Sequence, residues 1–177
     1  MNHRLVVVVG SLLWFGCGGD AAPPASESSA PSVAPPSQAA VKRIAACSLF
    51  TKTEIETLLG RPVMEGRQDE AAEISTCEYG NPEAPVINGT RTDVTLILAI
   101  FNGTRPNQAK AVYDIGKRNA AGVEAVNGLG DEAFWDAEES ALHVVTGNYL
   151  LDVMLKSDAG GLKPAQAIAQ QSLTKLP

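Results

Sequence analysis

Two segments of alternating apolar and polar residues flank the dipeptide Gly147-Asn148, at residues 141–146 and 149–156. A two-residue loop of this composition joins antiparallel strands through a primed turn, and it fixes which residues pair across the strands. His143 is then opposite Asp152, and the apolar side chains fall on the other face. The sequence therefore predicts a β-hairpin with one core face. The predicted core-facing residues are Leu142, Val144, Leu151 and Val153.

Hydrophobic periodicity predicts further elements before and after this hairpin. Thr51 and Glu54 have capping-box spacing and therefore begin a helix. Asn107 is expected to cap a second helix that packs through one face, and Pro164 suits the first turn of a terminal helix. Polar residues 61–73 are expected to be irregular. The expected strands are 75–79, 93–101 and 132–137, the expected helices are 51–59, 107–122 and 164–176, and the packing face of the second helix consists of Ala111, Val112 and Ile115.

These elements predict an α+β fold. We expect an antiparallel sheet with a C-terminal β-meander, packed on one side by two or three helices and stapled by one disulfide. A strand, a long strand and an Ala-rich helix occur at residues 75–118, and a similar order recurs at 132–176. This similarity leaves two explanations open, a duplicated half-fold and a chance likeness of two αβ layers.

The first residues have the composition of an export signal. Arg4 precedes an apolar run from Leu5 to Phe15, which is shorter than the ~20 residues that a membrane-spanning helix needs. We therefore expect a cleaved signal peptide, residues 1–16, and not an anchor helix. Residues 12–17, Leu-Leu-Trp-Phe-Gly-Cys, resemble the lipobox of bacterial lipoproteins, with Cys17 in the place of the lipid acceptor. Trp14 and Phe15 depart from that pattern.

The chain has three cysteines, Cys17, Cys47 and Cys77. An odd number in an exported protein leaves one thiol unpaired unless another group consumes it. A lipid such as palmitate on Cys17 would leave Cys47 and Cys77 to form a disulfide, which an oxidising compartment permits. Two buried free thiols, or half of a metal site, are the alternatives.

Composition then divides the chain into three parts. Residues 17–42 hold the lipidated cysteine and a tether rich in Ala, Pro and Ser, which cannot bury enough apolar surface to fold. Residues 43–177 form a single α+β domain. Removal of residues 1–16 takes away one basic residue, Arg4, and no acidic one, so the formal charge changes from −6 to −7. Such an acidic chain repels phosphate backbones, and we expect no nucleic-acid partner.

A dinucleotide fingerprint is matched by letters alone at residues 128–133, Gly-Leu-Gly-Asp-Glu-Ala. That motif binds pyrophosphate only when it follows a strand and begins a helix. Here Phe134 and Trp135 continue into a strand pattern, so a turn at the start of the meander is expected instead. We expect no cofactor.

Other candidate sites also have structural interpretations. His143 opposite Asp152 could be part of a catalytic site in which a carboxylate orients an imidazole, but a cross-strand ion pair is the simpler interpretation. Five acidic residues at 131–139 could hold calcium, or they could surround a solvated hairpin tip. Three aromatic residues could line a ligand cleft or belong to the core. These aromatic residues are Tyr79, Phe134 and Trp135.

The chain from about residue 46 to residue 176 resembles the uncharacterised lipoprotein domains of unknown function found in actinobacteria and other bacteria. The similarity rests on Cys47-Ser48-Leu49-Phe50-Thr51, on Cys77-Glu78-Tyr79 and on the segment 126–134, Val-Asn-Gly-Leu-Gly-Asp-Glu-Ala-Phe. It implies a disulfide between the two motif cysteines and a surface-anchored α+β domain. It implies no agreed substrate.

Two functions of different classes follow as hypotheses. The first is a non-catalytic module of the cell envelope, anchored to the cell membrane or outer membrane through lipid on Cys17, which binds an apolar small molecule or an envelope protein between its sheet and helices. The second is a secreted hydrolase that uses His143 and Asp152.

Overall fold

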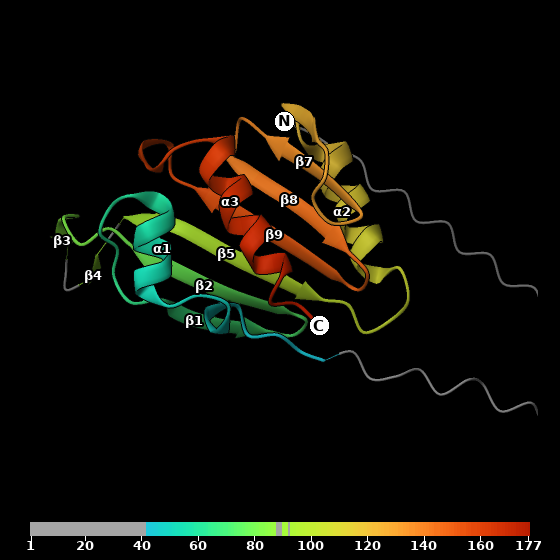
Figure 1. Ribbon diagram of the computed structural model, residues 1–177, viewed down its shortest axis with the longest axis horizontal. Coiled ribbons are helices and arrows are strands. Elements are labelled where there is room, and N and C mark those ends of the chain that lie inside the picture. The colour runs from blue at the N-terminus through green and yellow to red at the C-terminus, as the bar shows by residue number, and fades with distance from the viewer. Residues whose placement is uncertain (1–41, 88–89, 92) are drawn as a thin grey trace, which may run out of the picture. The chain divides into compact units, whose positions relative to one another are not determined.

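The computed structural model describes residues 42–87, 90–91 and 93–177, and within them seven strands form one antiparallel sheet in the order β1-β2-β5-β9-β8-β7-β6 (Figure 1). A separate short hairpin, β3–β4, lies outside that sheet. The strands are β1 (Arg67–Ala71), β2 (Ile74–Gly80), β3 (Val86–Ile87), β4 (Thr90–Arg91), β5 (Val94–Asn102), β6 (Val123–Val126), β7 (Glu132–Asp136), β8 (Ala141–Thr146) and β9 (Tyr149–Leu155). The helices are α1 (Lys52–Leu59), α2 (Gln108–Asn119) and α3 (Leu162–Leu173), with short 3-10 turns at Ala46–Ser48 and Ser157–Ala159.

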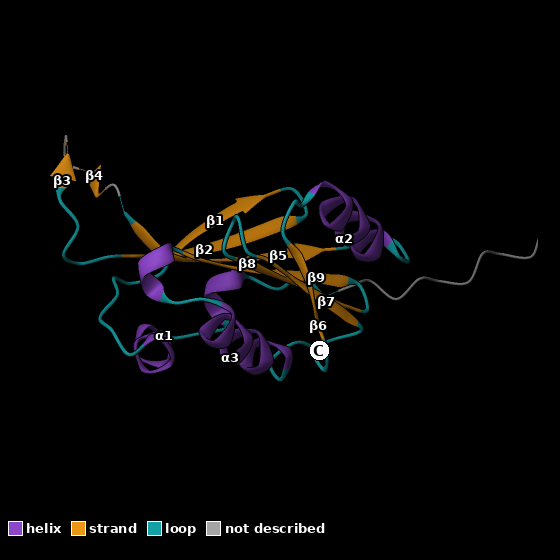
Figure 2. Ribbon diagram, turned by 90° about the horizontal axis from the view of Figure 1, so that it is seen from above, coloured by secondary structure: helices purple, strands orange, loops and turns teal. Residues whose placement is uncertain are grey.

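The helices cover both faces of the sheet. Figure 2 shows α1 and α3 on one face and α2 on the opposite face. The α+β class, the antiparallel sheet with its C-terminal meander and the packing of helices on it are therefore confirmed. The expectation that all helices lie on one side is corrected, because only α1 and α3 share a face and α2 covers the other. The main core lies under α1 and α3, where β5, β8 and β9 supply fully buried side chains such as Leu98, Val144 and Leu151. A smaller core lies under α2, around Tyr113 and Phe134.

The β8–β9 hairpin has the register that the two-residue loop predicts. His143 pairs with Asp152, Val144 with Leu151 and Thr146 with Tyr149. The alternation places the predicted apolar residues on the α3 face, where each is 0% exposed. Because β9 also pairs with β5, this hairpin joins the two halves of the sheet.

Helix α1 begins where the sequence predicts. Thr51 and Glu54 form the reciprocal capping box, and the chain leaves the helix at Gly60 in the left-handed conformation. At the other end of the chain, Pro164 lies in the first turn of α3, and Ile168 and Ala169 are completely buried. Both helices follow local patterns, so both predictions are confirmed.

The predicted packing face of α2 is wrong. Val112 is 38% exposed and Ile115 is 51% exposed, whereas Ala109 and Tyr113 are the buried residues of this helix. The predicted cap is also wrong in detail, because Asn107 precedes the helix in a left-handed conformation and its side chain makes no capping hydrogen bond. The aromatic ring of Tyr113 fills the space above Phe134, and this contact orients the helix.

Both edge strands of the sheet lie where the sequence predicts irregular or unassigned chain. Strand β1 is exposed along its whole length, and its Arg67 forms an ion pair with Glu78 of β2. Strand β6 follows α2 directly and is exposed except for Val126. Neither strand has the alternating pattern of a half-buried strand, which explains why the pattern fails to predict them.

The predicted disulfide joins Cys47 to Cys77, with 4.9 Å between the α-carbons and 30 residues of sequence separation. It ties the 3-10 turn before α1 to strand β2. The predicted signal peptide, lipidated Cys17 and most of the tether lie outside the described residues. Among the described helices, none is long and apolar enough to span a bilayer.

Candidate functional site

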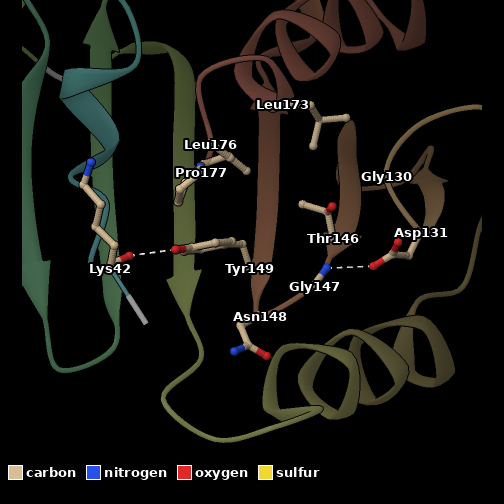
Figure 3. A pocket seen from close by; sticks show the side chains of 10 residues that line it. All are labelled: Lys42, Gly130, Asp131, Thr146, Gly147, Asn148, Tyr149, Leu173, Leu176 and Pro177. Carbon is tan, nitrogen blue, oxygen red and sulfur yellow. Dashed lines mark hydrogen bonds between the residues drawn. The ribbon is translucent and has the colours of Figure 1, made fainter. Parts of the chain in front are cut away.

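An open groove of about 720 Å³ lies between the β8–β9 turn and the C-terminal end of α3 (Figure 3). One wall comes from the turn itself and from Tyr149, the first residue of β9. The opposite wall is apolar and consists of Leu173, Leu176 and Pro177. The groove thus lies between the sheet and the end of a helix.

The wall formed by the β8–β9 turn and Tyr149 is held in place by two hydrogen bonds from side chains to the backbone. Asp131 accepts a hydrogen bond from the amide of Gly147 at 2.7 Å, and so ties the β6–β7 loop to the β8–β9 turn. The hydroxyl of Tyr149 donates to the carbonyl of Lys42 at 2.8 Å. Figure 3 shows both contacts, with the Tyr149 ring extending across the groove toward Lys42. These two hydrogen bonds therefore hold the wall formed by the β8–β9 turn and Tyr149 in place.

The segment that follows the tether is fixed to the sheet beside this groove. Asn102, at the end of β5, accepts a hydrogen bond from the amide of Ile44 and donates one to its carbonyl. The hydroxyl of Ser75 accepts one from the amide of Ala46 at 2.7 Å. These buried contacts hold residues 42–46 against the ends of β2 and β5.

On the opposite face of the sheet, the structure brings His143 and Asp152 together. Nδ1 of His143 lies 2.7 Å from a carboxylate oxygen of Asp152, and the two side chains are 19% and 25% exposed. Burial by itself would lower the pKa of His143. The hydrogen bond to Asp152 and the negative charges of Asp152, Asp136 and Glu139 outweigh burial, and the pKa of His143 is raised. The imidazolium form is thereby favoured.

The His143 ring also stacks on Phe134, with ring centroids 4.5 Å apart. Phe134 in turn contacts Tyr113 of α2 edge to face, at 5.2 Å. The three rings form a continuous row from the middle of the sheet to the helix. Phe134, Trp135 and Tyr79 are all at most 7% exposed, so these aromatic residues belong to the cores.

The fingerprint-like segment is a turn, as the sequence predicts. It connects β6 to β7, with Gly128 and Gly130 at positive φ, and no helix follows it. The structure also shows the surroundings of two acidic residues that the sequence offers as candidate calcium ligands. Asp131 binds the Gly147 amide, and Asp136 accepts from the amides of Glu138 and Glu139. Within the described part of the chain, no group of three acidic, His or Cys residues could hold a metal ion.

The sequence alone does not identify the groove. Lys42, Asp131, Tyr149 and Leu176 come from four separate segments, and only the folded domain brings them together. The chain matches no protein-family model, no curated protein and no solved structure.

Proposed function

We propose that this chain is a lipoprotein of the bacterial cell envelope, exported with residues 1–16 as signal peptide and anchored through lipid on Cys17. Its domain is a non-catalytic module that binds an apolar small molecule or an envelope protein. The lipobox-like sequence before Cys17 and the resemblance to uncharacterised lipoprotein domains support the anchoring. The observation that carries the binding role is the groove, in which the apolar end of α3 faces Tyr149.

The groove combines the features that small-ligand and partner sites share. Such sites are concave and largely apolar, with a few polar groups that fix the orientation of what binds. Leu173, Leu176 and Pro177 supply the apolar surface, and Asp131 and Lys42 lie on the polar side. Because Lys42 is the last residue of the expected tether, a bound ligand would lie next to the segment that connects the domain to its anchor.

Site-specific photo-crosslinking in living cells tests the binding role. A benzoylphenylalanine at position 176 should form a specific adduct with a lipid-sized molecule or with an envelope protein, identified by mass spectrometry. The same group at position 115 is the matched control, because Ile115 is an exposed apolar residue on the opposite face. Equal adducts at both positions, or none at 176, would contradict the proposed site.

The anchor is tested separately by Cys17→Ala. Retention by acyl chains depends on ~0.8 kcal/mol per buried methylene. The variant should therefore leave the membrane fraction and be found in the soluble exported fraction. An unlipidated, cleaved chain that stays with the membrane would show that another feature anchors it.

A hydrolase remains the second candidate, because Asp152 holds Nδ1 of His143 as a carboxylate orients an imidazole in hydrolytic sites. The other ring nitrogen has no hydrogen-bond partner among the described residues. The pKa of His143 is raised, and a general base must be deprotonated to act, so this role requires a working pH above that pKa. Loss of ester hydrolysis in purified His143→Gln, with Asp69→Asn as an unaffected control, would favour the hydrolase.

A further inference from the structure

One half of the sheet lacks a helix on the face that carries α2. Helix α2 packs on β8 and β9, while α1 and α3 lie on the opposite face (Figure 2). The small core under α2 takes in Phe101 at the end of β5. Among the described residues, no helix covers the same face of β1 and β2. We call this area, formed by β1, β2 and β5, the open half of the sheet.

The register of the sheet identifies the side chains that face outward on the open half. Phe134 contacts Tyr113 of α2. Directly paired residues share a face, so Ala99 and Asp69 lie in the same row as Phe134. The apolar side chains of this face are Ile74, Ile97, Ala99, Phe101 and, on the adjoining strand β9, Met154. Ile74 is 44% exposed, and all but Ala99 are at least partly exposed. A sheet face that meets water is normally polar, so this face has the composition of one that another element covers.

Helix α2 also exposes apolar side chains. Ile115 is 51% exposed and lies about 160° around the helix from Tyr113, which faces the sheet. Lys110 contacts Glu132 at the start of β7, so the flank of Lys110 faces β7. Val112 is 38% exposed on the other flank, toward the open half. Two exposed apolar surfaces therefore adjoin on one side of the domain, one on a helix and the other on strands.

The two surfaces carry complementary charges. Lys110 pairs with Asp114 and Glu132 inside the domain. Arg118, farther along α2, is exposed and has no ion-pair partner among the described residues. Asp69 on the open half is exposed and also lacks an ion-pair partner in the described part of the chain. The helix thus offers an unpaired cation, and the open half offers an unpaired carboxylate.

We propose that this side of the domain is the interface of a symmetric homodimer, in which α2 of each copy lies on the open half of the other. The two sheets face each other about a two-fold axis parallel to their strands. Rotation about that axis exchanges the two halves of the sheet, so each α2 meets an open half, as an isologous interface requires. Ile115 packs on the apolar side chains of the other copy, and the two Val112 side chains lie close to the axis. Arg118 lies over β1 of the other copy, near Asp69.

The same axis suits two copies that are anchored in one membrane, a point that rests on the proposed lipid anchor. The chain enters the domain at Lys42, beside Tyr149 at the start of β9. An axis parallel to the strands keeps both entry points at the same end of the dimer, so both tethers lead to one bilayer. The groove beside α3 stays open, because it lies on the opposite face of the sheet.

Cysteine crosslinking in membranes of cells that produce the full chain tests the geometry. Val112→Cys places two thiols close to the axis, so a short bis-maleimide should join the chains into dimers. Val123→Cys is the matched control, because Val123 is 39% exposed but lies on the edge strand β6, far from the axis. The chain without an added cysteine is the blank. A benzoylphenylalanine at position 115 should join two copies of this chain, and not the molecule captured at position 176. Crosslinking through Val123→Cys as strong as through Val112→Cys would overturn the proposed interface.

Sedimentation of the full chain in density-matched detergent tests the dimer itself. Ile115→Arg should weaken the dimer by about tenfold or more, because it places a charge on the apolar side chains of the other copy. Val123→Arg should leave the dimer unchanged. Ile115 is 51% exposed in the single domain, so urea unfolding should show that Ile115→Arg still folds. The interface contains only domain residues, so the result does not depend on lipid at Cys17. A monomer at about 100 μM, or a dimer that Ile115→Arg does not weaken, would overturn the proposal.

Discussion

Tyr79 and Tyr113 are each 1% exposed, but their hydroxyls have different surroundings. The Tyr79 hydroxyl donates to the carbonyl of Phe50 at 3.0 Å, and burial raises the pKa of Tyr79 to about 12, so it stays a donor at any ordinary pH. The Tyr113 hydroxyl has no partner within the described residues. The same substitution at the two positions therefore separates the packing of a ring from the pairing of its hydroxyl.

We expect Tyr79→Phe to lower the free energy of unfolding by about 1–2 kcal/mol, because it leaves a buried carbonyl unpaired. Tyr113→Phe should leave the free energy of unfolding unchanged or raise it. The substitution removes a buried hydroxyl whose desolvation is not offset by a hydrogen bond. Urea unfolding of the two variants beside the unsubstituted chain measures both values. A loss at Tyr113 as large as that at Tyr79 would reveal a partner for the Tyr113 hydroxyl in the folded domain.

His143 provides a pH-dependent contribution to stability. Its pKa is raised in the folded state by Asp152, Asp136 and Glu139, although burial opposes this shift. The stabilisation is therefore complete below the unfolded pKa of about 6.5, and it is lost as pH rises through the folded pKa.

We expect Asp152→Asn to lower the free energy of unfolding by up to about 1 kcal/mol at pH 5 and by less at pH 9. Asp69→Asn on the exposed strand β1 is the control and should show no such pH dependence. Chemical denaturation at the two pH values gives the energies, and NMR titration of the His143 ring gives its pKa. A cost that grows with pH would refute the assignment of the imidazolium to this pair.

At the scale of elements, a central strand and an edge strand of the sheet bury their side chains to very different extents. Val144 and Leu151 are 0% exposed beneath α3, whereas Val123 on the edge strand β6 is 39% exposed. We expect Val144→Ala and Leu151→Ala each to cost about 2–4 kcal/mol, as truncations in a closed core do. Val123→Ala should cost well under about 1 kcal/mol. Thermal and denaturant unfolding of the three variants would check the order, and equal costs would contradict this difference in burial.

Elements with strong local patterns could be predicted from the sequence, and those that depend on tertiary packing could not. The capping box at Thr51 and the two-residue turn at Gly147 act within a few residues, so their structures follow from the sequence. Helix α2 offers two plausible packing faces. The face that carries Tyr113 is buried because that ring fits above Phe134, a contact that depends on distant strands.

The candidate sites also differ in how far the sequence predicts them. The contact between His143 and Asp152 follows from the register of one hairpin, so it could be predicted. The groove needs Lys42 and Leu176 at the same end of the sheet, and these residues come from opposite ends of the described chain. An unpaired hydroxyl such as that of Tyr113 depends on every surrounding atom, and no sequence pattern encodes it.

For the whole molecule, the arrangement of layers argues against a duplicated half-fold. Strands β5 and β9 are antiparallel neighbours at the middle of the sheet. The two-fold axis that superimposes β5 on β9 is perpendicular to the sheet. Rotation about this axis would keep the helices that follow the two strands on the same face. Helices α2 and α3 lie on opposite faces, however (Figure 2). The recurring order of strands and an Ala-rich helix is therefore a likeness of two αβ layers and not a repeated unit.

The disulfide acts on the stability of the whole domain, because it ties the segment before α1 to strand β2 across 30 residues. Closing a loop of that length restricts the unfolded chain and contributes about 3 kcal/mol. The chain packs tightly against this disulfide, since a β-carbon at Gly66 would lie 2.6 Å from the Cys77 sulfur.

We expect the double variant Cys47→Ala/Cys77→Ala to unfold at lower denaturant concentration, with a loss of about 3 kcal/mol. Treating the native chain with reductant should give a similar loss, which separates the bond from the packing of its sulfur atoms. In the native, unreduced chain, peptide mapping after alkylation should find Cys47 and Cys77 unmodified. Two alkylated cysteines, or a double variant as stable as the oxidised chain, would show that the bond does not hold the domain together.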